Sequence, residues 1–297
     1  MTLEKKTVTV HTTLPEIDDA ALASFRLRTE RLLVRPLRHP ADLAALHAVR
    51  SQAAAMTSSR SGRPDASLAQ TEDKLKRLGP PYRDSHVYFG IFLLRRGKRG
   101  HEQGQGLQED RSGDTDEERD GDGEEEGELI GDGGVHAFAG SDSGWPELGY
   151  KFKREHWGRG YATEFAAAFV RFWWGLPRRP GRVEVAECSI SGATSSLSSP
   201  MYGGGEGGER GGRGIVEPGE VAGDDDHGRT ATAAVTKGGQ GQNVNDREVL
   251  TVSERLCAWT TASNEASQKV LCKVGFERFD GLENGLVNWR ATRMAPR

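Results

Sequence analysis

The sequence has few cysteines and no long apolar run, and these absences exclude several classes of protein. The three cysteines, Cys188, Cys257 and Cys272, lack the spacing of metal ligands and cannot all pair with one another, which suits a reducing compartment. No run of about 18 apolar residues occurs, so we expect no membrane-spanning helix. The N-terminal stretch MTLEKKTVTVHTTLPEIDDAAL lacks the apolar core of a signal peptide. We therefore expect a cytoplasmic protein, with a nuclear or organellar address left open.

Large apolar residues are also scarce, and the shortage is concentrated in two segments. Apolar residues make up 35% of the chain, against roughly 45–50% in a typical globular domain. Residues 97–127 are acidic and rich in glycine, and residues 191–246 include SGATSSLSSPMYGGGEGGERGGRG and show no apolar periodicity. Ordering such segments costs backbone entropy that little burial offsets. Both segments are predicted to be disordered insertions.

The remaining residues predict a single domain. Without the insertions about 200 residues are left, which is the size of one domain. We expect this domain to span residues 25–290 and to follow a flexible N-terminal extension, residues 1–24. The formal net charge of -4 provides no general attraction to nucleic acid or to an anionic membrane, so neither is an expected partner.

Apolar periodicity predicts alternating strands and helices in this domain. Alternation or runs of β-branched and aromatic residues indicate strands at residues 32–34, 86–96, 128–140, 146–152, 254–263 and from 276 onward. Helical periodicity begins at Asp42, covers residues 67–78 and 264–274, and places Phe165, Phe169 and Trp173 on one face of a further helix. This order of elements predicts a mixed α/β sheet.

The segment REHWGRGYATEF, residues 154–165, lies where a strand pattern gives way to a helix pattern. A helix N-terminus carries unpaired N–H groups and a partial positive charge, so it can hold phosphate oxygens if the backbone approaches closely. Gly158 and Gly160 remove Cβ atoms at this turn, and Arg159 adds a cation. The spacing differs from the dinucleotide-binding GxGxxG, because Thr163 occupies the place of the third glycine. A pyrophosphate is nevertheless the expected ligand of this junction.

Residues 157–162, WGRGYA, resemble the Q/R-x-x-G-x-G/A signature of the GNAT superfamily of acyl-CoA-dependent N-acetyltransferases, with Trp157 replacing the usual Gln or Arg. The longer string ELGYKFKREHWGRGYATE, residues 147–164, is similar to the branch that includes ribosomal-protein alanine N-acetyltransferases. TERLLVRPL, residues 29–37, resembles the first strand of that branch, and NEASQKVLCKVGF, residues 264–276, resembles its C-terminal motif. The three matches occur in the order that the family predicts.

The resemblance implies the GNAT fold, a mixed and mostly antiparallel sheet that is splayed at its fourth strand and flanked by helices. It also implies acetyl-CoA as co-substrate, with the pantetheine arm in the split and the pyrophosphate on the N–H groups of the glycine turn. Asn264 has two interpretations, an N-cap of the last helix and, by family analogy, a pantetheine contact. The implied coenzyme-binding residues are Tyr150, Phe152, Trp157, Gly158, Arg159, Gly160, Tyr161, Ala162, Thr163 and Asn264. No metal ion is implied.

Amide formation from a thioester requires a base for the amine, and GNAT enzymes transfer the acetyl group directly, so the expected base is a carboxylate. By analogy with the branch, Glu147 is the first candidate. His136 is the second, because its residue type suits proton transfer. Each also has a structural interpretation, a strand-end carboxylate at the surface and a packed histidine. A backbone N–H near Tyr150 is the expected oxyanion donor. Many family members carry a tyrosine that acts as general acid, and Leu271 occupies its place here. We therefore expect water, Ser267 or another group to assist the departing thiolate.

Together these features predict an N-acetyltransferase that moves an acetyl group from acetyl-CoA to a primary amine by direct attack on the thioester. The acceptor is a protein N-terminus or a small molecule, and the sequence does not choose between them. The alternative is a non-catalytic acyl-CoA-binding module with an acidic interaction tail, which the leucine at position 271 supports. No pattern indicates an oligomeric state.

Overall fold

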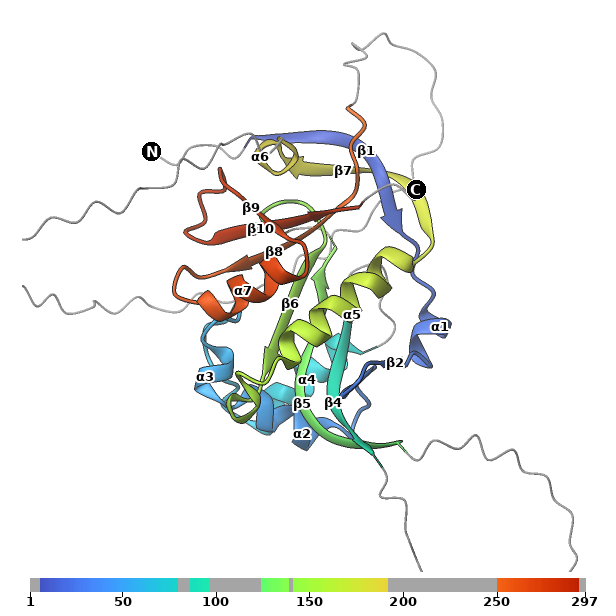
Figure 1. The fold of residues 1–297 in the computed structure, drawn as a ribbon, viewed down its shortest axis with the longest axis vertical. Coiled ribbons are helices and arrows are strands. Elements are labelled where there is room, and N and C mark those ends of the chain that lie inside the picture. The colour runs from blue at the N-terminus through green and yellow to red at the C-terminus, as the bar shows by residue number, and fades with distance from the viewer. Residues whose placement is uncertain (1–5, 80–85, 97–123, 139–140, 192–249, 294–297) are drawn as a thin grey trace, which may run out of the picture. The chain divides into compact units, whose positions relative to one another are not determined.

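A mixed sheet of eight strands forms the centre of the structure (Figure 1). The computed structural model describes residues 6–79, 86–96, 124–138, 141–191 and 250–293, all within one compact unit. The strands follow the order β2-β3-β4-β5-β6-β8-β10-β9, and all neighbours are antiparallel except β6 and β8, which are parallel. Their bounds are β2 Leu27–Arg28, β3 Leu32–Arg35, β4 Val87–Arg96, β5 Glu124–Ala137, β6 Glu147–Phe152, β8 Arg255–Thr260, β9 Glu277–Phe279 and β10 Val287–Thr292.

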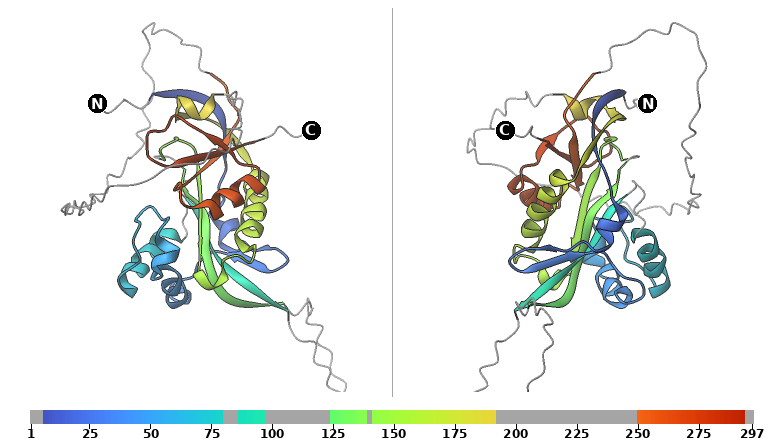
Figure 2. Two further views of the ribbon diagram at one scale, coloured as in Figure 1. Left: turned by 60° about the vertical axis from the view of Figure 1, so that its left-hand side comes forward. Right: turned by 90° about the vertical axis from the view of Figure 1, so that its right-hand side faces the viewer.

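Helices cover both faces of this sheet. Helices α5 and α7 lie on one face, and α2, α3 and α4 lie on the other (Figure 2). The helix bounds are α1 Asp19–Ala23, α2 Leu43–Arg50, α3 Ala53–Met56, α4 Leu68–Leu78, α5 Tyr161–Gly175, α6 Glu187–Ile190 and α7 Glu265–Lys273. Within the described residues, no helix combines the length and the hydrophobicity that a membrane span requires. The predicted mixed α/β sheet with flanking helices is confirmed.

The helix face predicted from sequence is the face that α5 buries. Phe165, Phe169 and Trp173 have no exposed surface and pack in the main core against the sheet. Full burial stabilises the fold by roughly 1.5–3 kcal/mol for each phenylalanine. These contacts hold α5 along the sheet, and they thereby fix the position of its N-terminus at Gly160.

Within the predicted flexible extension, residues 1–24, the described residues include a strand and a helix, while residues 1–5 lie outside the described part. Thr7–Pro15 forms β1, which pairs antiparallel with β7, Arg178–Ala186, in a separate two-stranded sheet. Val10 is fully buried and packs with Trp145 in a satellite core. The prediction failed because the partner of β1 lies on the far side of α5 in the sequence, where no local pattern reveals the pairing.

The first predicted insertion ends earlier than the sequence suggested. Residues 97–123 lie outside the described residues, but β5 begins at Glu124 and pairs with the end of β4, so the prediction is wrong for residues 124–127. The carboxylate of Glu126 lies 2.5 Å from Nη2 of Arg35, whose side chain is buried. Ion pairing, which apolar periodicity does not detect, accounts for this extension of the strand.

Two other segments differ from the predicted pattern. The second insertion, residues 191–246, lies outside the described residues apart from Ser191, whose hydroxyl donates to the Glu187 carbonyl at 3.1 Å. The single strand predicted from residue 276 is two strands, β9 and β10. Gly281 and Gly285 lie between them with φ values of +105° and +69°, and these backbone conformations let the chain reverse direction.

Candidate active site

Strands β6 and β8 separate after a single parallel pair. Glu147 pairs with Cys257, whose N–H donates to the Pro146 carbonyl at 2.8 Å. Within the described part of the chain no further pair joins these two strands, and the ribbons diverge from this point (Figure 1). The backbone edge of β6 beyond Glu147 therefore faces an opening in the sheet, as the predicted splay requires.

The carboxyl end of β6 enters α5 through a 3₁₀ turn, Arg154–His156, and a glycine turn. Gly158 and Gly160 have φ values of +72° and +83°, a region that residues with a side chain rarely adopt. The N–H of Glu164 donates to the Gly160 carbonyl at 3.0 Å. Among the described groups, none accepts a hydrogen bond from the N–H groups of residues 158–163, which are the unpaired donors of this helix end. The turn can therefore present these donors to an anion.

A side-chain bracket holds the start of α5. Oε1 of Glu164 accepts hydrogen bonds from the Thr29 hydroxyl at 2.6 Å and from the Arg31 N–H at 2.9 Å, and Oε2 accepts from Nε of Arg31 at 2.7 Å. Nη1 of Arg31 also donates to the Arg159 carbonyl inside the glycine turn at 2.9 Å. Burial acts to raise the pKa of Glu164, but the hydrogen bonds from Thr29 and Arg31 outweigh it and hold that pKa below its ordinary value. The bracket therefore fixes the turn by charged hydrogen bonds.

Trp157 lies at the end of β6 with 50% of its surface exposed. Its indole Nε1 donates to the Phe152 carbonyl at 2.8 Å. Because this carbonyl is already engaged, Tyr150 is the stronger of the two backbone contacts predicted for the pantetheine arm. Both contacts stay predictions.

The two predicted base candidates lie together at the point where the strands separate. Oε1 of Glu147 lies 2.7 Å from Nε2 of His136 and accepts a hydrogen bond from Nε1 of Trp259 at 2.7 Å. Glu147 is 3% exposed. The glycine at position 149 leaves room for the His136 ring, because a Cβ there would lie only 2.9 Å from Nδ1 of the imidazole. Glu147 is thus a buried carboxylate that contacts two ring nitrogens rather than a surface group at a strand end.

The third catalytic candidate, Ser267, lies elsewhere in the split. Asn264 caps α7 as predicted: its Oδ1 accepts from the Ser267 N–H at 3.2 Å, and its Nδ2 donates to the Ser58 hydroxyl at 3.0 Å. The Tyr150 hydroxyl is buried beside Ser267 without a well-formed hydrogen bond, and burial raises the pKa of Tyr150 to about 12. Leu271, at the family's tyrosine place, is buried in the core. Ser267 therefore belongs to the side of the split that α7 covers.

A cavity of about 340 Å³ opens next to Trp259. The described residues that line it are Thr57, Ser58, Ser59, Arg60, Asp142, Trp259, Thr261 and Leu286. Nη2 of Arg60 lies 3.7 Å from Oε1 of Glu147, and the Arg60 side chain is 60% exposed. The cavity thus combines hydroxyl groups, one carboxylate and one guanidinium next to the buried Glu147.

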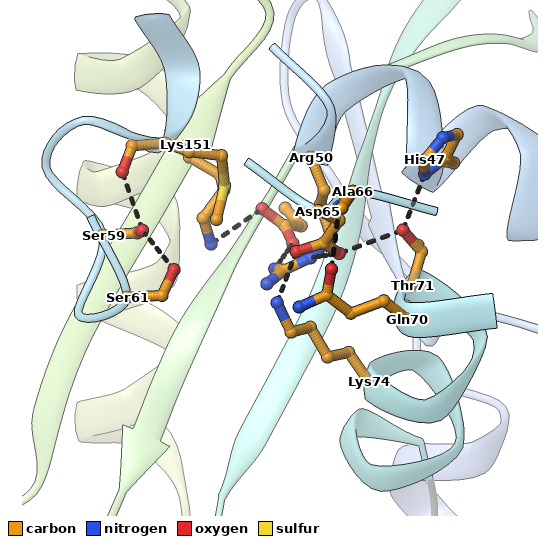
Figure 3. Close-up of polar contacts among 12 residues, drawn as sticks. His47, Arg50, Ser59, Ser61, Asp65, Ala66, Gln70, Thr71, Lys74 and Lys151 are labelled. Atoms are coloured by element: carbon orange, nitrogen blue, oxygen red, sulfur yellow. Dashed lines mark hydrogen bonds and ion pairs between the residues drawn. The ribbon is translucent and has the colours of Figure 1, made fainter. Parts of the chain in front are cut away.

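A buried ion network fastens the loop that forms one wall of this cavity (Figure 3). Nε of Arg50, the last residue of α2, donates to Oδ2 of Asp65 at 2.9 Å, and the Asp65 N–H donates to the Arg50 carbonyl at 2.9 Å. Nη1 of Arg50 lies 3.3 Å from Oδ2 of Asp132, whose Oδ1 lies 3.2 Å from Nζ of Lys151 on β6. The two ends of the segment of residues 51–64 are therefore bonded to each other through Arg50 and Asp65. This contact holds the base of the loop that carries Arg60.

One group of potential metal ligands occurs among the described residues: Glu128, Glu155 and His156. The Glu128 carboxylate already lies 2.6 Å from Nζ of Lys153 and 3.4 Å from Nε2 of His156. The Lys153 ammonium occupies the place of a cation, so ion pairing accounts for this group.

Comparison with known proteins decides the family. Residues 31–191, more than half of the chain, match the acetyltransferase (GNAT) domain family. The chain belongs to this family. It is therefore an acyltransferase, and the GNAT resemblance predicted from the sequence is confirmed. No match is found among curated protein sequences.

Solved acetyltransferase structures are similar to this chain at low sequence identity. A GNAT-family acetyltransferase from Bacillus anthracis is 14% identical, with 91% of this chain and 99% of that chain covered and a TM-score of 0.45. A putative ribosomal-protein-serine acetyltransferase from Vibrio cholerae is 13% identical, covering 91% and 98% with a TM-score of 0.43. RimL, a ribosomal L7/L12 alpha-N-protein acetyltransferase solved with coenzyme A, is 11% identical, covering 90% and 98% with a TM-score of 0.46. Similarity at this level does not identify an acceptor.

Sequence reasoning missed several residues of this candidate site. Arg31 and Thr29 lie in a segment that the sequence identified only as a strand, and their contacts with Glu164 span more than 130 positions. Trp259 could have been found from the sequence, because it lies two residues after Cys257 in a predicted strand and therefore on the same face of the sheet. Arg60 had none, because it lies in a loop without apolar pattern.

Proposed function

We propose that this protein transfers the acetyl group of acetyl-CoA to the nitrogen of a primary amine by direct attack on the thioester. One observation carries the proposal: the buried Glu147 carboxylate, bonded to His136 and Trp259, lies where the sheet splits and next to a polar cavity. A carboxylate in that position can take a proton from an amine held in the cavity.

The donor is expected to occupy the split on the opposite side of this carboxylate. Its pyrophosphate would accept hydrogen bonds from the free N–H groups of residues 158–163, whose turn the Arg31–Glu164 bracket fixes. Its pantetheine arm would run along the open edge of β6, past Tyr150 and Asn264. This arrangement directs the thioester toward the point where β6 and β8 separate.

The chemistry then requires one proton acceptor, one oxyanion donor and one leaving group. The amine nitrogen attacks the thioester carbon, a C–N bond forms, and the amine proton passes to Glu147 directly or through water. A backbone N–H on the open edge of β6, at Tyr150, stabilises the oxyanion. The C–S bond breaks as the intermediate collapses, and the thiolate takes a proton from water or from Ser267.

The test uses the full-length protein, acetyl-CoA and a panel of amines that includes amino acids, polyamines and peptides. We expect release of free thiol together with a mass increase of one acetyl group on the acceptor. Binding of acetyl-CoA without transfer to any amine in the panel would favour the non-catalytic acyl-CoA-binding module instead.

A further inference from the structure

Arg60 is the one positively charged side chain among the described residues that line the cavity. Its guanidinium makes no hydrogen bond within the described part of the chain, and its contact with Glu147, at 3.7 Å, is longer than a hydrogen bond. Oε1 of Glu147 is already engaged by His136 and Trp259. Among the described residues, no group therefore competes with a ligand for the hydrogen-bond donors of Arg60.

The framework holds the backbone of the loop that carries Arg60. The loop that carries it is closed at its base by the Arg50–Asp65 pair and tied to the start of α7 through the Ser58–Asn264 hydrogen bond. A guanidinium presents a planar fork of donors that matches a carboxylate with two parallel hydrogen bonds. The cavity thus holds a guanidinium that can bind an anion, carried on a tied loop beside the group that would accept the amine proton.

We propose that the acceptor is a free α-amino acid, whose amine faces Glu147 and whose α-carboxylate binds Arg60. This inference rests on the proposed acetyl transfer and names its substrate class. Because Arg60 and Glu147 lie only 3.7 Å apart, the amine and the carboxylate of the acceptor must be separated by very few bonds, as they are in an α-amino acid. A cavity of about 340 Å³ lies at the small end of ligand sites, which are roughly 300–1,000 Å³.

The same geometry disfavours other amines. A polyamine would place its second cation near the Arg60 guanidinium, and like charges repel. A peptide N-terminus has an amide in place of the α-carboxylate and would leave the guanidinium without its anion. The side chain of the amino acid would extend toward the hydroxyl groups and Asp142, which lies in the same cavity with its Oδ2 bonded to Asn284 at 2.9 Å.

The experiment compares kcat/KM for three forms of each amino acid: the free acid, its α-carboxamide and the amine that lacks the carboxyl group. We expect the free acid to be preferred by about 10- to 100-fold, the range of a hydrogen-bonded charge. Arg60→Gln should abolish this preference by lowering kcat/KM for the free acid alone. Arg60→Lys should keep part of it. Arg63→Gln, an exposed arginine three positions along, should leave it unchanged.

The outcomes separate this inference from the proposed function. Equal transfer to the three forms, or an unchanged preference in Arg60→Gln, would overturn the amino-acid assignment while acetyl transfer stands. Transfer to peptides but not to free amino acids would overturn it as well. Failure to acetylate any amine would refute both. Measurement of the melting temperature of each variant separates loss of recognition from loss of folding.

Discussion

Replacing Glu164 by Gln removes the charge of the bracket that holds the glycine turn. The carboxylate accepts three hydrogen bonds at 2.6, 2.9 and 2.7 Å and is 16% exposed, while the Arg31 side chain is 42% exposed. A hydrogen bond to a charged group contributes about 1.5–3 kcal/mol, but solvent screens the exposed Arg31, and glutamine keeps one acceptor oxygen. We therefore expect a loss of about 1–2 kcal/mol, or roughly 2–8 °C in Tm for a domain of this size.

The stabilisation that Glu164 provides should depend on pH, and its lowered pKa decides the direction. The pKa of Glu164 in the folded state is lowered from 4.5, so the folded state favours the ionised form. Its contribution to stability is fully present above the unfolded pKa near 4.5 and disappears as the pH falls through the lower folded value. The difference in Tm between the wild type and Glu164→Gln should therefore be constant near neutral pH and shrink below about pH 4.

Thermal denaturation monitored by circular dichroism, at pH 7 and over the acid range, measures this difference. Glu265→Gln is a matched control, because Glu265 also lies in the first turn of a helix but is 77% exposed and pairs with Lys269 at 3.6 Å. It should change Tm by less than the bracket variant, since an exposed i,i+4 pair contributes about 0.3–0.5 kcal/mol. Equal Tm values for Glu164→Gln and the wild type at pH 7 would refute the reasoning.

Three other predictions concern the donor site, the base and the N-terminal strand. Gly160→Glu should abolish CoA binding measured by calorimetry, because the new side chain strains a backbone with a φ of +83° and its charge repels the phosphates. The control variant Gly175→Glu, at the other end of α5 with open space around the Cβ, should bind CoA as the wild type does. Glu147→Gln should lower kcat by about 10²–10⁴-fold with CoA affinity retained, and an unchanged rate would exclude it as the base. Val10→Ala should cost about 1–3 kcal/mol in urea denaturation because Val10 is fully buried, and the exposed Thr9→Ala should cost less than about 0.5 kcal/mol.

Local sequence patterns predicted the parts of the fold whose cause is local. The apolar face of α5 follows from a 3.6-residue period. The turn before it follows from Gly158 and Gly160, because glycine adopts the left-handed backbone conformation without strain. The cap of α7 by Asn264 is equally local, since donor and acceptor lie three residues apart. These features needed no knowledge of what packs against them.

The missing parts depend on contacts between distant segments. Strand β1 finds its partner in β7, and Glu126 is ordered by Arg35, which lies 91 positions earlier. The carboxylate of Glu147 was a candidate, but its burial depends on Trp259 and on the space that Gly149 leaves for His136. No period or motif in one segment encodes such pairings, so the sequence could name a candidate base without its surroundings.

The loop of residues 51–64, which includes the short helix α3, contacts both sides of the candidate site. Gln52, at its start, accepts a hydrogen bond from the Arg154 N–H at 2.9 Å at the end of β6, and Ser58, near its middle, accepts from Asn264 at the start of α7. The loop is therefore tied to both arms of the split, on the face opposite α5. The acceptor group proposed at Arg60 and the donor path proposed along β6 are thus connected, through one loop, by these two hydrogen bonds.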